Sequence, residues 1–410
     1  MQKDDVKRIA ETFQSAGAEI FIVGGAVRDF LLQKEVKDID FELYSLNAEK
    51  VLEICQALGK ADIVGQSYGV IKLTIDNKTY DIALPRTERK TGNKHTDFIV
   101  NADPFMNKEN ACRRRDISIN AMMMNPLTDE ILDFFGGRED IKNKVIRHVD
   151  AKTFVEDSLR VLRAAQFAAR FNFIIADDTL KLCQGIDLAD LPAERIKEEV
   201  FKLLLKSDKP SIGIKALNLI GVSAKLFNSL FTDDKVYYEL LDNAALTANS
   251  FNHVEVKLAI LLSALMFKFS AEEVEFVCDK LDLHTYNNYK LRNQLLLVNK
   301  FQQYPYTMER TRKNYNHLVN TGIDIGLLAA VYKLFNHENS SGFYNTFLGL
   351  RIPVKNGKVR AIIEGSHLLE MGFEAGPQMG LILKDVYQKQ LDDEIQSLDE
   401  AFKYVKAIWK

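Results

Sequence analysis

IFIVGGAVRD, residues Ile20–Asp29, is the most informative segment of this sequence, and Asp38-Ile39-Asp40 follows it closely. Side chains at positions i and i+2 of a strand point the same way, so Asp38 and Asp40 project together if Ile39 faces a core. Two carboxylates this close repel each other unless a cation lies between them, and Mg²⁺ prefers such ligands together with phosphates. The two glycines let backbone N–H groups approach a phosphate. Together these features indicate nucleotidyl transfer, whereas Asp-x-Asp alone is more often an exposed strand end.

Composition places the chain among globular proteins. Its 410 residues are 47% hydrophobic and 27% charged, which is typical of about two to four domains with sizeable cores. The net charge of −3 argues against nonspecific coating of nucleic acid but allows a local basic surface that binds RNA. The 4 cysteines lack C-x-x-C spacing, which indicates reduced thiols and no zinc site. We find neither a secretory signal nor an apolar run long enough to span a bilayer, so we expect a cytoplasmic protein without a membrane partner.

The first ~140 residues mix strand and helix patterns. Asn47–Leu58 predicts a helix that ends at Gly59. The segment Arg86–Asp103 carries charges and few aliphatic residues, and we expect a mobile loop there. Strands are expected at Phe21–Val23, Ile39–Leu43, Val70–Ile75 and Tyr80–Leu84. Beyond about residue 150 helical patterns follow one another, with breaks near Asp187–Pro192, Ser207–Pro210, Pro305 and Asn356–Gly357. The predicted fold class is therefore α+β, a small head with a mixed sheet followed by an all-α remainder.

A second motif, RRRDISINA, occupies Arg113–Ala121. Guanidinium groups pair well with phosphate oxygens, while Asp116 and Asn120 suit the hydroxyl groups of a ribose. A plain basic surface patch is the alternative for this motif taken alone.

A third motif combines a helix start with an acceptor–donor pair. Thr153–Glu156 has the pattern of a capping box and predicts a helix that starts near Phe154, with Asp157 and Arg160 on one face. Asp offers only acceptors and Arg only donors, so the pair matches the edges of cytosine and adenine and rejects those of uracil and guanine. An ordinary helical ion pair is the alternative.

These motifs together resemble those of the bacterial class II tRNA nucleotidyltransferases, the CCA-adding enzymes of the polymerase-β-like superfamily, almost continuously over residues 20–205. Asp133–Gly137, continued by Asp140-Ile141 and Ile146-Arg147, resembles the head-to-neck hinge of that family, and Ala193–Ile196 resembles its neck-helix motif. Arg86–Lys90 resembles the start of the family's flexible loop, and Gly365–Gly380 more weakly resembles its tail element.

The resemblance implies an enzyme that adds or repairs the 3′-terminal CCA of tRNA from CTP and ATP, with release of pyrophosphate. It implies two Mg²⁺ ions held by Asp38 and Asp40, a third catalytic carboxylate at Asp81, and contacts with the acceptor arm and 3′ end of tRNA. The implied nucleotide-binding residues are Gly24, Gly25, Arg28, Arg115, Asp116, Asn120, Asp157, Arg160 and Arg163. It also implies four parts: a catalytic head at 1–140, a base-recognising neck at 141–205, a helical body at 206–300 and a tRNA-binding tail at 301–410.

Three other functions remain open: a poly(A) polymerase, an enzyme that adds only A, and a non-enzymatic RNA-binding protein. Bacterial poly(A) polymerases share the head motifs but usually differ at Val64–Val70, which here resembles the CCA-adding version. Enzymes that add only CC usually lack the flexible loop, and enzymes that add only A share all of these motifs. A non-enzymatic RNA-binding protein could use the same scaffold, although the intact Asp38 and Asp40 argue against it. Lys257–Leu265 resembles a helix of an HD-type phosphohydrolase but has Ser263-Ala264 where His-Asp would be needed, so we expect no phosphohydrolase site.

Overall fold

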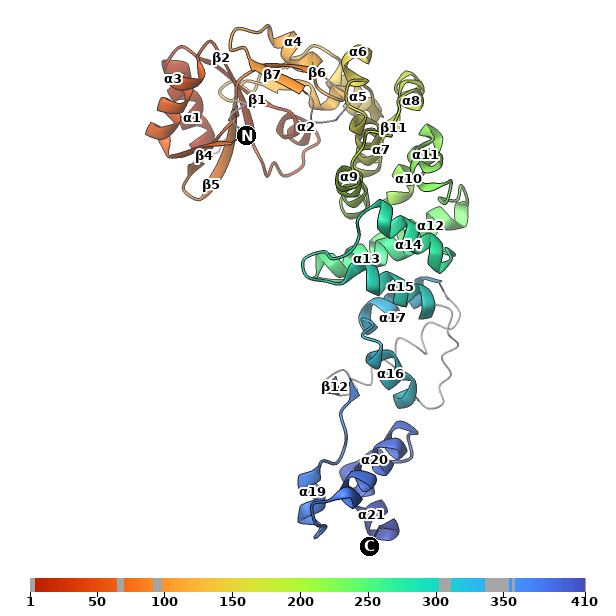
Figure 1. The fold of residues 1–410 in the computed structure, drawn as a ribbon. Coiled ribbons are helices and arrows are strands. Elements are labelled where there is room, and N and C mark those ends of the chain that lie inside the picture. The colour runs from red at the N-terminus through yellow and green to blue at the C-terminus, as the bar shows by residue number, and fades with distance from the viewer. Residues whose placement is uncertain are drawn as a thin grey trace. The chain divides into compact units, whose positions relative to one another are not determined.

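The computed structural model describes residues 4–64, 70–90, 98–301, 311–335, 354–355 and 358–409. They form two compact units, Met1–Leu230 and Phe231–Lys410. Figure 1 shows the mixed strands and helices of the first unit and the helices that dominate the second. This confirms the predicted α+β class, while the finer division into four parts stays a prediction.

The head is built on a seven-stranded sheet with the strand order β3-β4-β5-β2-β1-β8-β9. Strands β2 and β5 run parallel, and the other neighbours are antiparallel. The strands are β1 (Glu19–Val23), β2 (Asp40–Tyr44), β3 (Lys60–Val64), β4 (Val70–Ile75), β5 (Lys78–Ala83), β8 (Met122–Met124) and β9 (Ile131–Asp133). The four expected strands are confirmed within one or two residues as the adjacent strands β4, β5, β2 and β1, and β3, β8 and β9 are additional.

Strand β1 is apolar from Ile20 to Val23 because both faces of the sheet are covered there. Ile20 and Ile22 belong to the larger core of the head, while Phe21 and Val23 belong to a smaller core on the other face. This alternation follows the two-residue period of a strand. The helices of the head are α1 (Asp4–Ser15), α2 (Gly25–Leu31), α3 (Ala48–Leu58), α4 (Lys108–Arg113) and α5 (Gly137–Asn143). The expected helix is confirmed at α3, where Asn47 accepts a hydrogen bond from the N–H of Lys50 and Gly59 ends the helix.

The loop expected over Arg86–Asp103 is wrong for the part that the structure describes. Strand β6 (Arg86–Lys90) pairs antiparallel with β7 (Phe98–Ala102), with Arg86 opposite Ala102. The apolar residues Phe98-Ile99-Val100 favour a strand. The charged segment Arg86–Lys90 has no strand pattern of its own and becomes a strand by pairing with them. Residues 91–97, between the two strands, lie outside the described residues.

The remainder of the first unit is helical. Its helices are α6 (Ala151–Phe154), α7 (Leu159–Phe171), α8 (Asp177–Gln184), α9 (Ala193–Leu205), α10 (Pro210–Ile220) and α11 (Val222–Phe227). Two short strands, β10 (Val145–Ile146) and β11 (Ile174–Ile175), pair in parallel among them. The breaks expected near Asp187–Pro192 and Ser207–Pro210 are confirmed as the starts of α9 and α10.

The capping box expected at Thr153–Glu156 is wrong. Asp150 caps α6 instead, because its carboxylate accepts from the N–H groups of Lys152 and Thr153 at 3.0 Å each. The next helix, α7, begins only at Leu159, so Asp157 lies in the turn between the two helices. Asp150 is as good a capping residue as threonine and starts the helix earlier.

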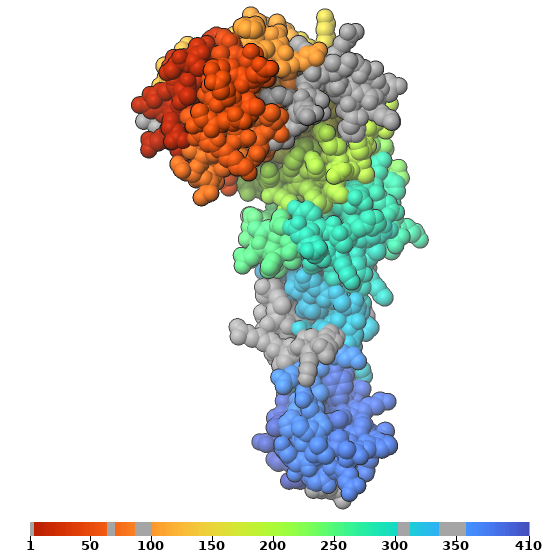
Figure 2. Space-filling view, turned by 60° about the vertical axis from the view of Figure 1, so that its left-hand side comes forward, coloured from red at the N-terminus to blue at the C-terminus, as the bar shows by residue number. Residues whose placement is uncertain are grey.

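Where it is described, the second unit consists mainly of helices, and strand β12 (Val354–Lys355) pairs antiparallel with β13 (Lys358–Val359). Its helices are α12 (Lys235–Ala248), α13 (Val254–Leu265), α14 (Ala271–Lys280), α15 (Leu291–Phe301), α16 (Thr311–Asn320), α17 (Ile325–Phe335), α19 (Gly365–Glu370), α20 (Pro377–Leu391) and α21 (Leu398–Ile408). The last three pack around a core that includes Leu368, Ile382 and Val405. Figure 2 shows the C-terminal part of the chain in blue.

Among the described residues, no single helix is long and apolar enough to cross a membrane. One pair, Arg312–Asn320 with Ile325–Phe335, is long and apolar enough only when both helices are taken together, and it is bent by 113°. Three sequence expectations fall outside the described residues. They concern residues 65–69, the break at Pro305 and the break at Asn356–Gly357.

Candidate active site

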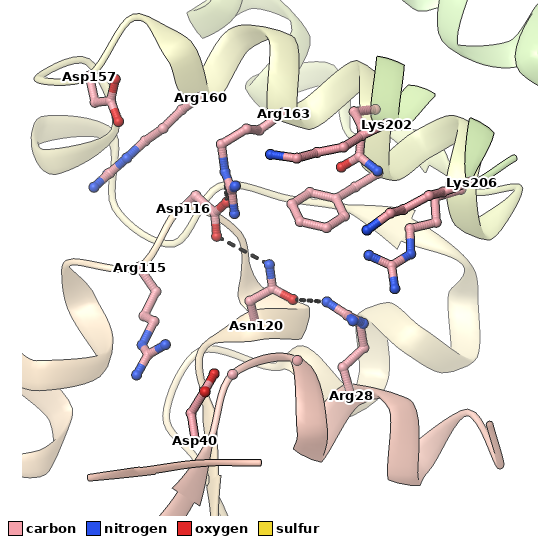
Figure 3. A pocket seen from close by; sticks show the side chains of 15 residues that line it. Arg28, Asp40, Arg115, Asp116, Asn120, Asp157, Arg160, Arg163, Lys202 and Lys206 are labelled. Carbon is pink, nitrogen blue, oxygen red and sulfur yellow. Dashed lines mark hydrogen bonds and ion pairs between the residues drawn. The ribbon is translucent and has the colours of Figure 1, made fainter. Parts of the chain in front are cut away.

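A cavity of about 470 Å³ opens in the first unit and collects residues from distant parts of the sequence (Figure 3). One side, which we call the head wall, comprises Gly24, Gly25, Arg28, Asp40, Arg115, Asp116 and Asn120. The other side, the neck wall, comprises Asp157, Arg160, Arg163, Gln166, Phe167, Arg170, Lys202 and Lys206. Ten of the twelve predicted site residues therefore line one cavity, whereas Asp38 and Asp81 are not among its lining residues.

The carboxylates of the head cluster at the start of β2. Ile39 is buried, as expected, and Asp40 opens the strand next to it. Asp81 on the parallel strand β5 lies opposite Asp40 in the register. Burial, together with the negative charges of Asp81 and Asp38, raises the pKa of Asp40. Carboxylate oxygens are ligands that a divalent cation prefers, although in the described part of the chain no three His, Cys, Asp or Glu side chains are already gathered closely enough to hold a metal ion.

Gly24 and Gly25 make the turn between β1 and α2. Gly24 has a φ of 68°, in the left-handed region that favours glycine, and a Cβ there would lie 3.1 Å from Nη1 of Arg115. A larger residue would therefore strain the backbone and displace Arg115. Backbone conformation and side-chain packing thus both explain the glycine at position 24.

Arg28 is a buried cation at the base of the head wall. Its Nη2 lies 2.8 Å from Oδ1 of Asp29, its Nη1 donates to Oδ1 of Asn120, and its Cζ lies 4.6 Å from the ring centroid of Phe171. Burial lowers the pKa of Arg28, and the charge of Asp29 opposes that shift. These partners fix the guanidinium in one orientation at the cavity.

Asp116 and Asn120 form a hydrogen-bonded pair that joins the head wall to the neck wall. Nδ2 of Asn120 donates to Oδ1 of Asp116 at 3.3 Å, and Nε of Arg163 donates to Oδ2 of Asp116 at 2.7 Å (Figure 3). Burial raises the pKa of Asp116, but the charge of Arg163 and these hydrogen bonds outweigh it and hold the pKa below its usual range. The carboxylate is therefore ionised and acts as the link between α7 and the head.

Asp157 and Arg160 lie at one end of the neck wall, where Figure 3 places their side chains near each other. Oδ1 of Asp157 accepts from the N–H of Leu159 at 3.1 Å. Arg160 donates from Nη1 to the carbonyl of Thr153 at 2.9 Å and from Nη2 to the carbonyl of Arg114 at 2.8 Å. A guanidinium has five N–H donors, so these two bonds orient Arg160 and leave donors for a ligand.

Five residues of the neck wall were missed by the sequence reasoning. They are Gln166, Phe167, Arg170, Lys202 and Lys206. The first three continue α7 from Arg163 at spacings of three, four and seven residues, and Lys206 follows Lys202 by four residues on α9. Helical spacing extended from Arg163 would have found the members on α7, but nothing in the sequence indicates that α9 packs beside α7.

The hinge motif, Asp133–Gly137, connects the end of β9 to the start of α5. Oδ1 and Oδ2 of Asp133 accept from the N–H groups of Gly137 and Arg138, respectively, at 2.9 Å each. A Cβ on Gly137 would lie 2.5 Å from the carbonyl oxygen of Ser118, so only glycine fits beneath the segment that carries Asn120. The motif therefore has a structural role in supporting the head wall.

Comparison with known proteins finds relatives of this sequence and of this fold. Residues 20–147 match the Poly A polymerase head domain family. Over 216 residues the chain is 38% identical to a Multifunctional CCA protein of Haemophilus ducreyi, which covers 51% of this chain and 50% of that protein. The chain thus spans about half the length of the curated relatives it matches.

Solved structures extend the likeness to the whole chain at the level of fold. A CCA-adding enzyme with CTP matches with a TM-score of 0.71 and 22% identity, covering 99% of this chain and 94% of that one. The Thermotoga maritima CCA-adding enzyme complexed with tRNA_CCA matches with a TM-score of 0.63 and 22% identity, covering 99% and 95%. The resemblance drawn from the sequence motifs is therefore confirmed.

Proposed function

We propose that this protein is a template-independent nucleotidyltransferase that builds or repairs the 3′-CCA end of tRNA from CTP and ATP and releases pyrophosphate. The observation that carries the proposal is the composition of one cavity. It combines a strand-end carboxylate, a glycine and arginine surface suited to phosphates, and an acceptor–donor pair suited to a base edge. The names of the relatives at 38% identity support the same activity.

The carboxylates of the head are proposed to bind magnesium. Asp38 and Asp40 would hold two Mg²⁺ ions, and Asp81 would add a third acidic group beside them. Such ions, when bound, supply Lewis-acid activation of a hydroxyl and neutralise phosphate charge. Burial, reinforced by the negative charges of Asp81 and Asp38, raises the pKa of Asp40, and a cation bound at this position would stabilise the ionised carboxylate.

The phosphates and ribose of the nucleotide are assigned to the rest of the head wall. The triphosphate would be contacted by Gly24, Gly25, Arg28 and Arg115, because guanidinium groups pair well with phosphate oxygens. Asp116 and Asn120 would orient the ribose hydroxyls, and Arg163 holds Asp116 ionised for this purpose.

The base is assigned to Asp157 and Arg160. The carboxylate of Asp157 would accept from the exocyclic amino group of cytosine or adenine, and Arg160 would donate to the ring nitrogen beside it. Uracil and guanine present the opposite pattern and would leave buried groups unpaired. The carbonyl anchors on Arg160 support this role, since an oriented guanidinium discriminates better than a mobile one.

The helical second unit is proposed to bind the acceptor arm of tRNA, mainly through phosphates. The printed name of the Thermotoga neighbour, a complex with tRNA_CCA, supports this partner. A cytoplasmic location without a membrane partner and the absence of an HD-type phosphohydrolase belong to the same proposal.

A single assay tests the function. Purified protein is incubated with Mg²⁺, labelled CTP or ATP, and tRNA that lacks A, CA or CCA, and the products are resolved by gel. We expect one A, then C and A, then two C and A to be added, and no addition to tRNA that already ends in CCA. Long A tracts on any RNA would indicate a poly(A) polymerase instead, and addition only to tRNA lacking A would indicate an A-adding enzyme.

A further inference from the structure

Glu42 is a buried acid that none of the roles above uses. It lies two residues after Asp40 on β2, on the same face of the strand, and only 1% of its surface is exposed. Burying an ionised carboxylate is costly unless it is paired and hydrogen-bonded. Its partners therefore indicate what the carboxylate does.

The two oxygens of Glu42 have different partners. Oε2 accepts from Nη2 of Arg115 at 3.2 Å and lies 3.8 Å from Nη2 of Arg114. Oε1 accepts from the hydroxyl of Tyr44, the next residue on the same face of β2, at 2.5 Å. Tyr44 is itself buried against Phe21, with ring centroids 6.0 Å apart. Tyr44 thus fixes the carboxylate through Oε1, and the carboxylate holds Arg115 through Oε2.

Arg115 connects Glu42 to the cavity, because it binds Glu42 and lines the cavity. Its Nη2 is bound by Glu42, while its Nη1 lies beside Gly24, 3.1 Å from the position of a Cβ. Figure 3 shows Arg115 on the side of the cavity that also holds Asp40. The negative charge of Glu42 raises the pKa of Arg115 against the effect of burial, so the guanidinium stays charged at the glycine turn.

We propose that Glu42 is a positioning residue that orients Arg115 toward the triphosphate of the incoming nucleotide, with Tyr44 fixing Glu42 in turn. This inference rests on the proposed function, because it takes a nucleoside triphosphate as the ligand. Glu42 does not touch the nucleotide. It fixes one edge of the guanidinium so that the other edge faces the phosphates at Gly24.

Substitution of Glu42 by glutamine tests the proposal, because Glu42→Gln keeps the shape and removes the charge. We expect KM for CTP and for ATP, and the Kd for CTP measured by calorimetry with Mg²⁺, to rise about tenfold. We expect kcat and the preference for CTP over UTP to change less than about twofold. Glu109→Gln is the matched control, since Glu109 pairs with Arg113 on the surface of the same head, and it should leave all of these quantities unchanged.

A double-mutant cycle separates positioning from general stability. Arg115→Ala should raise the same KM at least as much, and adding Glu42→Gln to Arg115→Ala should cause no further rise. Tyr44→Phe, which keeps the carboxylate, should raise KM in the same direction by a smaller factor and serves if Glu42→Gln does not fold. A Glu42→Gln variant with a lowered Tm but unchanged KM and Kd would overturn the proposal, as would additive effects in the cycle.

The outcome for the proposed function is distinguishable. If the wild-type protein binds CTP but adds nothing to tRNA, the proposed function fails, while the calorimetric comparison of wild type with Glu42→Gln still decides the role of Glu42. If the wild-type protein does not bind CTP, the role of Glu42 in orienting Arg115 toward a triphosphate is overturned as well.

Discussion

The head wall and the neck wall of the cavity are built in different ways. The head wall comes from the start of β2, the glycine turn, the first residues of α2 and the segment around Asn120, where a buried hydrogen bond joins Arg28 to Asn120. The neck wall comes from side chains on α7, α9 and the turn before α7. The comparison suggests a division of labour, in which the head wall binds what all nucleotides share and the neck wall distinguishes their bases.

The largest effect is expected from Asp40→Ala on the head wall. Loss of this carboxylate removes a ligand from the proposed metal site, so kcat/KM should fall by about three orders of magnitude or more for CTP and ATP alike. Binding of tRNA, measured by filter retention, should stay nearly intact. Asp62→Ala, which removes an exposed acid of the same head paired with Lys60, is the control. Near-normal incorporation by Asp40→Ala would refute the carboxylate assignment.

A smaller but selective effect is expected from Asp157→Ala on the neck wall. The only acceptor of the proposed pair is lost, and a hydrogen bond to a charged group contributes roughly 1.5–3 kcal/mol, so discrimination should fall by about one to two orders of magnitude. The measurement is kcat/KM for CTP, ATP, UTP and GTP with matched tRNA ends. Asp187→Ala is the control, because Asp187 also accepts from an N–H two residues on but does not line this cavity. An unchanged ratio of CTP to UTP would leave Asp157 with a turn-capping role only.

A third variant asks whether the neck wall also contacts phosphates. Burial and the charges of Arg170 and Lys202 lower the pKa of Lys206, which indicates a local excess of positive charge that an anion would relieve. Lys206→Gln should raise KM for CTP by about threefold and flatten the dependence of KM on salt concentration. Lys209→Gln, outside the cavity, should do neither. Equal behaviour of the two variants would confine phosphate binding to the head wall.

The smallest effect concerns folding and tests the corrected start of α6. Asp150→Ala should lower the free energy of unfolding by about 1 kcal/mol at neutral pH, whereas Asp150→Asn, which can still cap, should lower it less. The N–H of Thr153 holds the pKa of Asp150 below its usual value. The stabilisation is therefore fully present above the unfolded pKa of about 3.9 and is lost as the pH falls through the lower folded pKa.

Thermal unfolding of wild type and both Asp150 variants at neutral and at acidic pH measures this difference. The gap between wild type and Asp150→Ala should narrow in acid. A gap that stays constant with pH would show that Asp150 stabilises α6 without its charge.

The sequence by itself determined the local part of this protein. The apolar run before Gly24 fixes a strand and a turn, and the alternation around Ile39 fixes the side to which Asp40 points, because both depend on a few consecutive residues. Most members of the head wall could therefore be predicted. The pairing of β6 with β7 could not, since Arg86–Lys90 becomes a strand only through its partner.

Only the tertiary structure decided the long-range part. Arg115 meets Glu42 across 73 residues of sequence, and Arg160 meets the carbonyl of Arg114 across 46. The placement of Lys206 likewise depends on how α9 packs against α7. Such contacts follow from the packing of whole elements, which no local pattern encodes. The sequence around Glu42 therefore does not reveal its partner, whereas the hydrogen bond to Arg115 in the folded structure does.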